Sequence, residues 1–213
     1  MDLDKIAVFA RELMINRCSH INREQGYIYF HGQRVGQIAL QLRNLIFPRT
    51  VEFDEVILVG SWFHDLGKGI EPHWESGAVL VGDLLSEHCS PDELTKIKEI
   101  VVGHTLRKER EYPFYVQLVQ DADILDHFGT QDIWLNFTRC GYTRKGMDDS
   151  LRFYDEVYDE QMNKIRSLLN FEESLEFFDE KDRFLREFIE RFRAEGKGKL
   201  IKKEEKTRGW ECP

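Results

Sequence analysis

Apolar side chains recur along the first part of the chain at the three- and four-residue spacing of amphipathic helices. One apolar stripe runs through residues 2–16, and a second runs through residues 35–46. Pro48 follows the second stripe and disfavours helical backbone in the residue before it. The pattern therefore predicts two amphipathic helices, each with one face turned toward a core.

The next segment, EVILVGSWFHDL at residues 55–66, is apolar on nearly every side. A helix that is hydrophobic all round belongs in the interior of a protein. Asp54 precedes the segment and is a good N-cap, while Gly67 and Gly69 are typical of a helix end. We therefore predict a central, buried helix with a His-Asp pair at its end.

Helical spacing continues through the rest of the chain. Pro72 stands where a first-turn proline belongs, Ser90-Pro91 opens a further helix, and Gly129 ends another. With two longer amphipathic stretches near the end, the predicted helices cover residues 73–88, 92–104, 115–129, 150–170 and 174–195.

Few segments lack this spacing. YIYF at residues 27–30 is the only convincing β-type run, and it is too short to build a sheet on. NFTRCGYTRKG at residues 136–146 indicates a turn, and the lysine- and glycine-rich residues 196–213 indicate a mobile tail. The sequence thus predicts an all-α fold with a single domain of residues 1–195.

Composition argues against several classes of protein. With 41% hydrophobic residues, the 213-residue chain can bury an ordinary core. The net charge of -9 argues against nucleic acid as a partner, since backbone binding needs a basic surface. No apolar stretch approaches the roughly 18 residues of a membrane span. The four cysteines form no CxxC pair, which favours reduced thiols and a cytoplasmic protein.

Histidines and aspartates fall at the ends of the predicted helices, where side chains from several elements can converge. Imidazole and carboxylate together are the ligands of borderline divalent metals. Each such histidine taken alone is more often a surface or core residue than a ligand. The residues concerned are His31, His64, Asp65, His73, His104 and Asp123. As a set, they are candidates for a metal site at converging helix ends.

The order of these residues resembles that of the HD superfamily of metal-dependent phosphohydrolases. FHGQRVGQIA, FHDLGKG, HWESGA, VVGHT and DADILD reproduce the order H…HD…H…H…D across residues 31–123. NFTRCGYTRKGMDDSLRFYDE and DRFLREFIERFRAE are similar to the C-terminal helices of small stand-alone bacterial HD hydrolases. The resemblance spans roughly residues 20–195 and implies the helical bundle of that family.

The resemblance implies a basic metal site formed by His31, His64, Asp65 and Asp123. In family members with a second metal, histidines at the positions of His73 and His104 join the site and the HD aspartate bridges the two ions. Contact with a substrate phosphate is the alternative for these two histidines. One or two divalent ions are therefore expected. Manganese, iron, cobalt, nickel, zinc and magnesium all suit such ligands.

In the chemistry that the resemblance implies, a metal-bound hydroxide attacks phosphorus, because the ion lowers the pKa of its water. Asp65 holds the metal, and Lys68 offsets transition-state charge unless it is an ordinary helix-end lysine. Some family members carry a glutamate at the position of Lys68, so the proton donor is open in this chain. Asp126 is the first candidate, with Glu75 and Asp121 as alternatives.

Several basic residues lie near the motif positions in sequence. Arg34 comes one turn after the first motif histidine, Arg107 belongs to a basic cluster after VVGHT, and Arg144 and Lys145 form another. Together with Lys68, they are candidates for binding a substrate phosphate. An ordinary surface ion pair is the alternative for Arg34, and a solvated charge run is the alternative for the two clusters.

We therefore expect an enzyme that cleaves a phosphate ester or anhydride of a small molecule. A nucleotide is the expected substrate, for a nucleoside triphosphate pyrophosphohydrolase or a 5′-nucleotidase. The second hypothesis is a low-turnover regulatory module that binds metal or nucleotide, and the third is a di-iron oxygenase with similar ligands. Retention of all six ligand positions favours the hydrolase. A homodimer is compatible with the sequence, which does not fix the oligomeric state.

Overall fold

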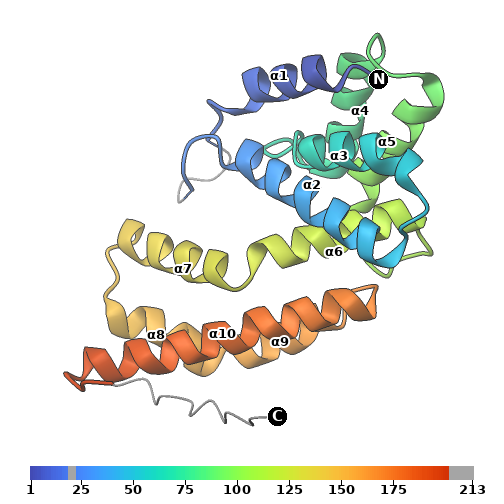
Figure 1. Ribbon diagram of the computed structural model, residues 1–213. Helices are drawn as coiled ribbons and strands as arrows, with labels where there is room; N and C mark the ends of the chain where they lie inside the picture. The colour runs from blue at the N-terminus through green and yellow to red at the C-terminus, as the bar shows by residue number, and fades with distance from the viewer. Residues whose placement is uncertain (19–22, 202–213) are drawn as a thin grey trace, which may run out of the picture.

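The computed structural model describes residues 1–18 and 23–201, and all regular structure within them is helical (Figure 1). This confirms the all-α fold expected from the sequence. A short 3-10 turn at Val51–Phe53 precedes the third helix. The α-helices are α1 (Leu3–Met14), α2 (Tyr27–Ile46), α3 (Asp54–Phe63), α4 (His73–Leu85), α5 (Pro91–Gly103), α6 (Phe114–His127), α7 (Thr130–Tyr142), α8 (Met147–Glu156), α9 (Tyr158–Arg166) and α10 (Glu172–Gly196).

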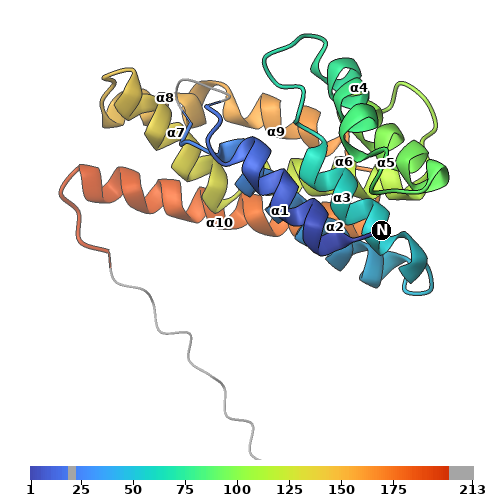
Figure 2. The same cartoon turned by 90° about the horizontal axis from the view of Figure 1, so that it is seen from above.

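The helices form two regions, which we call the N-terminal region (α1–α6) and the C-terminal region (α7–α10). In the N-terminal region, α2 packs against α3 and α6, while α5 packs against α3 and α4 (Figures 1 and 2). In the C-terminal region, α7 extends away from the end of α6, and α8, α9 and α10 form a layer beneath them in Figure 1. Contacts of α10 with α2 and α6 join the two regions.

The apolar segment predicted as a central helix is α3, and it is buried as expected. Val59, Gly60 and Phe63 are among its fully or nearly fully buried residues. The predicted N-cap role of Asp54 is wrong, because Phe53 is the N-cap residue and the Asp54 carboxylate accepts hydrogen bonds from Arg43 at 2.6 and 2.8 Å. A charged partner on the neighbouring helix thus outcompetes a local cap.

The β-type run at residues 27–30 is helical, so its interpretation as extended chain is wrong. Gly26 adopts the left-handed conformation at a φ of 75° and starts α2 directly before Tyr27. Tyr27 and Ile28 are buried, and the Tyr27 ring stacks on His31 one turn later. Tertiary packing therefore overrides the β-propensity of four residues.

Two boundaries in the C-terminal region also differ from the sequence prediction. Residues 136–142, predicted as a turn, complete α7, and the turn is confined to residues 143–146. Cys140 is buried on this helix, and Asn136 donates a hydrogen bond to the Ser150 hydroxyl of α8, so α7 is held by packing that the local sequence does not show. The predicted helix of residues 150–170 is two helices, α8 and α9, which meet at Val157.

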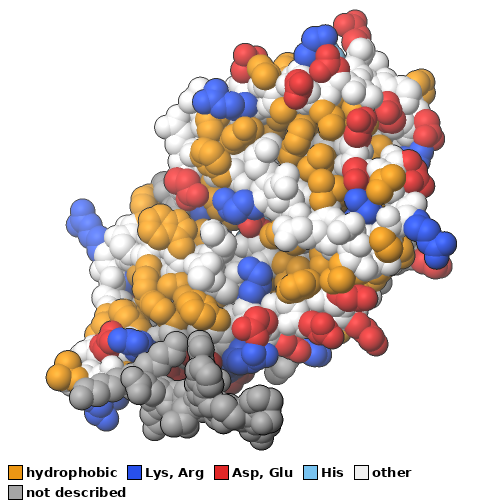
Figure 3. Space-filling model, viewed as in Figure 1, with side chains coloured by type: hydrophobic (Ala, Val, Ile, Leu, Met, Phe, Trp, Pro, Cys, Tyr) orange, Lys and Arg blue, Asp and Glu red, His pale blue; other side chains and the backbone are white. Residues whose placement is uncertain are grey.

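The Gly129 prediction is confirmed, because Gly129 follows the end of α6 with a φ of 74°. The predicted helix start at Ser90-Pro91 is also confirmed: α5 begins at Pro91, and the Ser90 hydroxyl accepts a hydrogen bond from the Glu93 backbone. On the face shown in Figure 3, acidic and basic side chains are interspersed. Within residues 1–18 and 23–201, no helix combines the length and the apolar character that crossing a membrane requires.

Candidate metal centre

His64 and Asp65 lie in a tight turn between α3 and α4, and both are buried. A Cβ atom at Gly67 would lie 2.0 Å from the His73 carbonyl oxygen, so a glycine is needed for the turn to approach α4 this closely. The Arg17 guanidinium donates to the carbonyl oxygens of Leu66 and Lys68, each at 2.7 Å. The backbone around the His-Asp pair is therefore fixed from two sides.

The turn brings His64 against side chains from α2 and α6. Nε2 of His31 lies 3.2 Å from Nε2 of His64 and 3.0 Å from Oδ1 of Asp123. The His64 Nε2 atom is 3.8 Å from carboxylate oxygens of both Asp65 and Asp123. The four residues that the resemblance implied for a basic metal site thus meet at one point.

The protonation of the two imidazoles follows from their partners. Burial lowers the pKa of His64 to about 4, so this ring is neutral near pH 7. Burial also lowers the pKa of His31, but hydrogen bonds to Asp123 and Asp126 outweigh burial and raise the pKa to about 9. The carboxylates therefore favour positive charge at this point, in the form of either a proton or a metal ion.

A second group forms around the other side of Asp65. Nε2 of His104 lies 3.4 Å from Oδ1 of Asp65, and Nε2 of His73 lies 3.9 Å from the same oxygen. Both Nε2 atoms are buried without a hydrogen-bond partner among the described residues. Buried nitrogen atoms without partners are costly, so such a pair indicates a site for a bound ligand.

The hydrogen bonds of the histidines indicate what that ligand is. Nδ1 of His64 donates to the Ser61 carbonyl, and Nδ1 of His104 donates to the Val101 carbonyl, each at 2.7 Å. When these rings are neutral, each Nε2 presents a lone pair toward Asp65. Lone pairs that face a carboxylate repel it unless a cation lies between them. The residues therefore fit divalent ions, and the ligand atoms of His31, His64 and Asp65, and those of Asp65, His73 and His104, lie within 4.8 Å of one another.

The contacts of Asp126 argue against its predicted role as proton donor. Its carboxylate accepts a hydrogen bond from His31 Nδ1 at 2.7 Å and from Arg34 at 2.7 and 2.9 Å. Burial raises the pKa of Asp126, but these donors outweigh burial and lower the pKa to about 2. Asp126 therefore stays ionised and orients His31, as carboxylates commonly do behind a metal-ligating histidine. The guanidinium of Arg34 is held by Asp126, which argues against the predicted phosphate-binding role of Arg34 as well.

Asp121, an alternative proton donor, is fully buried and accepts hydrogen bonds from the backbone amides of Asn170 and Phe171 ahead of α10. These contacts join α6 to the start of α10 and argue against a role of Asp121 as proton donor. Lys68 lies beside the centre, with Nζ 3.5 Å from Oδ1 of Asp65. This position is compatible with the predicted role of Lys68 in offsetting phosphoryl charge.

The remaining predicted phosphate ligands are divided between two places. Arg107 forms an ion pair with Asp123 and lines a cavity of about 530 Å³. Arg144 and Lys145 are exposed in the turn between α7 and α8, and neither lines that cavity. Lys145 instead lines a smaller cavity of about 210 Å³, so the YTRKG cluster is not gathered at the centre.

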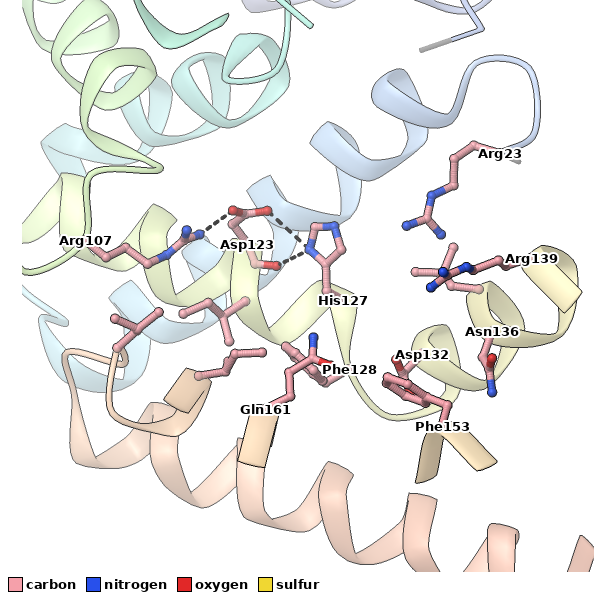
Figure 4. Close-up of a pocket in the computed structure, with 14 residues that line it drawn as sticks. Arg23, Arg107, Asp123, His127, Phe128, Asp132, Asn136, Arg139, Phe153 and Gln161 are labelled. Atoms are coloured by element: carbon pink, nitrogen blue, oxygen red, sulfur yellow. Dashed lines mark hydrogen bonds and ion pairs between the residues drawn. The ribbon is translucent and has the colours of Figure 1, made fainter. Parts of the chain in front are cut away.

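A cavity of about 530 Å³ opens beside Asp123 and His127, between α6, α7 and α9 (Figure 4). This volume is typical of small-molecule sites. Its apolar wall comes from Phe128, Phe153 and aliphatic side chains, and its polar atoms come from residues at both ends. The cavity places a substrate-sized space directly against one side of the candidate metal centre.

Sequence reasoning missed most residues of this cavity. The polar lining residues that it did not identify as site residues are Arg23, His127, Asp132, Asn136, Arg139 and Gln161. His127 fits no position of the HD motif, yet its Nε2 lies 3.3 Å from the Tyr27 hydroxyl and its Nδ1 lies 3.5 Å from Oδ1 of Asp123. The helical phase of α6 places His127 one turn after Asp123, which was the available signal. The α7 residues of the cavity could not be found from the sequence, because part of this helix was predicted as a turn and its facing side was therefore unknown.

Comparison with known families identifies the same region of the chain. The family model of the HD domain matches residues 28–127. This span begins at α2 and ends at the last residue of α6, and it contains all six candidate ligands. No curated protein is matched by the sequence.

Solved structures with the same fold extend over nearly the whole chain. A crystal structure of an HD-superfamily hydrolase from Bacillus thuringiensis has a TM-score of 0.67 and 23% identity, covering 92% of this chain and 97% of that chain. YpgQ of Bacillus subtilis, in complex with ADP, has a TM-score of 0.64 and 16% identity, covering 90% and 93%. A predicted HD superfamily hydrolase from an uncultured Thermotogales bacterium has a TM-score of 0.58 and 18% identity, covering 91% and 92%.

Proposed function

We propose that this chain is a metal-dependent phosphohydrolase of the HD superfamily and that it cleaves a phosphate ester or anhydride of a nucleotide. The match of residues 28–127 to the family model of the HD domain supports this proposal. The observation that carries the proposal is the arrangement around Asp65. Its carboxylate faces imidazole nitrogens from both of the groups described above, and two of these nitrogens are buried without a partner. Such an arrangement is stable only with positive charge in its centre.

His31, His64, Asp65 and Asp123 would hold the proposed first ion, and Asp65, His73 and His104 would hold the second. A bound divalent ion supplies Lewis acidity there: it lowers the pKa of water and neutralises charge on a phosphoryl oxygen. The set contains imidazole and carboxylate but no thiolate, which suits manganese, iron, cobalt, nickel or zinc. We expect manganese to support activity.

The other residues of the centre orient the candidate ligands and offset charge on the phosphoryl group. The Asp126 carboxylate accepts a hydrogen bond from Nδ1 of His31 and so keeps Nε2 of His31 directed at the centre. The Lys68 ammonium, beside Asp65, is placed to offset charge on the phosphoryl group. Arg17 holds the backbone carbonyls on both sides of Gly67, which fixes the position of Asp65 and Lys68 relative to each other.

Two observations support a nucleotide as the substrate. The cavity next to Asp123 has a volume of about 530 Å³, and its wall combines aromatic rings with arginines, as the base and the phosphates of a nucleotide require. YpgQ, which shares the fold over most of both chains, was crystallised in complex with ADP. A phosphorylated sugar alone would leave much of the apolar wall without contacts.

The proposal is tested by phosphate release from a panel of nucleoside mono-, di- and triphosphates. Manganese, cobalt, nickel, zinc or magnesium is added to metal-stripped protein one at a time. The phosphate-containing products are identified by phosphorus NMR. Metal-dependent hydrolysis that disappears in Asp65→Ala supports the proposal. Pyrophosphate as product identifies a triphosphate pyrophosphohydrolase, and orthophosphate from a monophosphate identifies a 5′-nucleotidase.

The same experiment separates the competing hypotheses. Protein that binds metal but releases no phosphate from any nucleotide would be a regulatory module. Oxygen consumption with iron-loaded protein, in place of phosphate release, would identify an oxygenase. The matched control is Asp179→Ala, which removes an exposed carboxylate paired with Arg166 and leaves the centre intact.

A further inference from the structure

The cavity carries two arginines at the end away from Arg107. Arg23 precedes α2, and Arg139 lies near the end of α7. In Figure 4 their side chains extend into the same end of the cavity, whereas Arg107 and Asp123 lie at the other end. Residues far apart in sequence thus bring two positive charges to one place.

Neither Arg23 nor Arg139 forms an ion pair or a side-chain hydrogen bond within the described part of the chain. Several other arginines have such partners: Arg34 pairs with Asp126, Arg43 with Asp54, Arg107 with Asp123 and Arg166 with Asp179. The cavity is lined by two carboxyl groups, and both are engaged. Asp123 is paired with Arg107, and Asp132 accepts a hydrogen bond from Tyr154.

The position of Arg23 relative to the metal centre is fixed by Tyr27. The Arg23 guanidinium carbon lies 4.9 Å from the centroid of the Tyr27 ring, and the same ring stacks on His31 at 5.6 Å. The Tyr27 hydroxyl also contacts His127 at 3.3 Å. One aromatic side chain therefore separates Arg23 from a candidate metal ligand, a separation that suits neighbouring phosphates of one chain.

From this arrangement we infer that Arg23 and Arg139 form an anion subsite that binds the phosphates beyond the one attacked at the metal centre. The substrate is then a phosphoanhydride chain of two or three phosphates rather than a monoester. The inference rests on the proposed function, because it takes the metal centre as the place of cleavage. Arginine suits this role, since its planar fork donates two parallel hydrogen bonds to phosphate oxygens.

The inference is tested by calorimetric titration of metal-stripped protein with orthophosphate, pyrophosphate and tripolyphosphate. The variants are Arg23→Gln and Arg139→Gln, which remove the charge but keep most of the side-chain volume. Arg11→Gln is the matched control, because Arg11 is exposed on α1 and outside the cavity. Melting temperatures of all variants verify that the fold is retained.

We expect the affinity of the wild-type protein to rise with the length of the phosphate chain. Each cavity variant should weaken tripolyphosphate binding by about tenfold, the size of one charge-assisted contact, and the loss should be smaller for orthophosphate, which presents fewer oxygen atoms to the two arginines. Arg11→Gln should bind all three anions as the wild type does. No loss of tripolyphosphate binding in either cavity variant, or an equal loss in Arg11→Gln, would overturn the subsite.

Kinetics with metal-loaded enzyme separate a failure of the subsite from a failure of the proposed function. If triphosphates are hydrolysed but Arg139→Gln leaves their KM unchanged, the subsite is refuted and the hydrolase stands. If tripolyphosphate binding depends on both arginines but no nucleotide is hydrolysed, the hydrolase is refuted and the anion site stands. A rise in KM for triphosphates, with KM for monophosphates unchanged, supports both.

Discussion

The N-terminal and C-terminal regions are both helical, yet they bury very different parts of their surface. Most of the 14 residues of α6 are buried, and they include the ionisable Asp121, Asp123 and Asp126. Of the 13 residues of α7, only Ile133 and Cys140 are buried. The two helices are separated by only two residues, Phe128 and Gly129. Burial therefore changes abruptly along the chain at this point.

The charges of the two regions differ in the same way. In the N-terminal region, Asp126 is 3% exposed and shares its oxygens between Arg34 and His31. In the C-terminal region, Arg166 and Asp179 form a pair with both side chains nearly half exposed. Buried charges are costly to leave unpaired, whereas exposed pairs contribute little. The N-terminal region thus fixes the geometry of the centre, and the C-terminal region supplies a wall whose surface is freer to vary.

The largest expected difference between the regions concerns removal of one carboxylate. Asp65→Ala should lower the turnover number by on the order of a thousandfold, because Asp65 belongs to both ligand groups. Asp179→Ala should leave turnover unchanged and alter the free energy of unfolding by less than about 1 kcal/mol. Steady-state kinetics and chemical denaturation measure the two effects. A comparable loss of turnover in both variants would contradict the distinction between the regions.

A pair of glycines provides the next comparison. Gly67→Ala places a Cβ atom 2.0 Å from the His73 carbonyl, whereas Gly141 in α7 has no neighbouring atom within 4 Å of such a position. We expect Gly67→Ala to lower the free energy of unfolding by about 2–3 kcal/mol. Gly141→Ala should raise it by roughly 0.5 kcal/mol, since alanine is the better helix former. Urea denaturation of both variants tests this, and a tolerated Gly67→Ala would show that the turn can move.

A third comparison sets two Arg–Asp pairs against each other. Asp126→Asn should weaken metal binding by about 10- to 100-fold, because Asp126 orients His31 from behind. Asp54→Asn breaks an equivalent bidentate pair with Arg43 at a position that forms no hydrogen bond to the candidate ligands within residues 1–18 and 23–201, so it should lower stability without changing metal affinity. Metal titration monitored by calorimetry distinguishes them. Equal metal affinity in wild type and Asp126→Asn would refute the orienting role.

The smallest effect concerns Asp132, a carboxyl of the C-terminal region without a cationic partner. Burial raises the pKa of Asp132 to about 6, against the smaller opposing effects of Tyr154 and Arg23. The folded protein therefore binds this proton more tightly than the unfolded chain does, and ionisation above pH 6 costs stability. Asp132→Asn should be more stable than the wild type by about 1–2 kcal/mol at pH 7.5, after allowance for partial exposure. The difference should shrink as the pH falls toward 4.

Thermal denaturation of both proteins across this pH range measures the change. A constant difference would show that the Asp132 side chain titrates equally in the folded and unfolded states. Asp155→Asn, on the exposed face of α8, is the control for a carboxylate paired at the surface.

The N-terminal region was largely predictable from the sequence because its chemistry is carried by residues at helix ends. His31, His64 and Asp123 are spaced across almost a hundred residues, yet helical periodicity and motif order were sufficient to predict that they meet. Burial made this possible: α3 is apolar throughout, so its end had to lie inside the protein. The ligand roles themselves remain proposals.

The sequence was least informative where the role of a side chain depends on which other side chains it contacts. Arg34 and Asp126 were each assigned a separate role, and the sequence gives no sign that they bind each other. Residues 136–146 contain a glycine and polar side chains typical of turns, but packing of Cys140 and the contact from Asn136 to α8 extend the helix. Arg23 and Arg139 could not be found, because the cavity that unites them exists only once α7 is placed.

The turn at Gly129 has a consequence for how such an enzyme can be redesigned. Gly129 has a φ of 74°, and a Cβ atom added at this position would lie only 3.2 Å from Lys181 of α10. The start of α7 therefore lies directly against α10. Side chains that line the cavity from α7 can then be exchanged while the helix keeps its path. A mutant library confined to the cavity-facing positions of α7 would thus vary substrate choice, while the side chains that α6 contributes to the candidate metal centre stay the same.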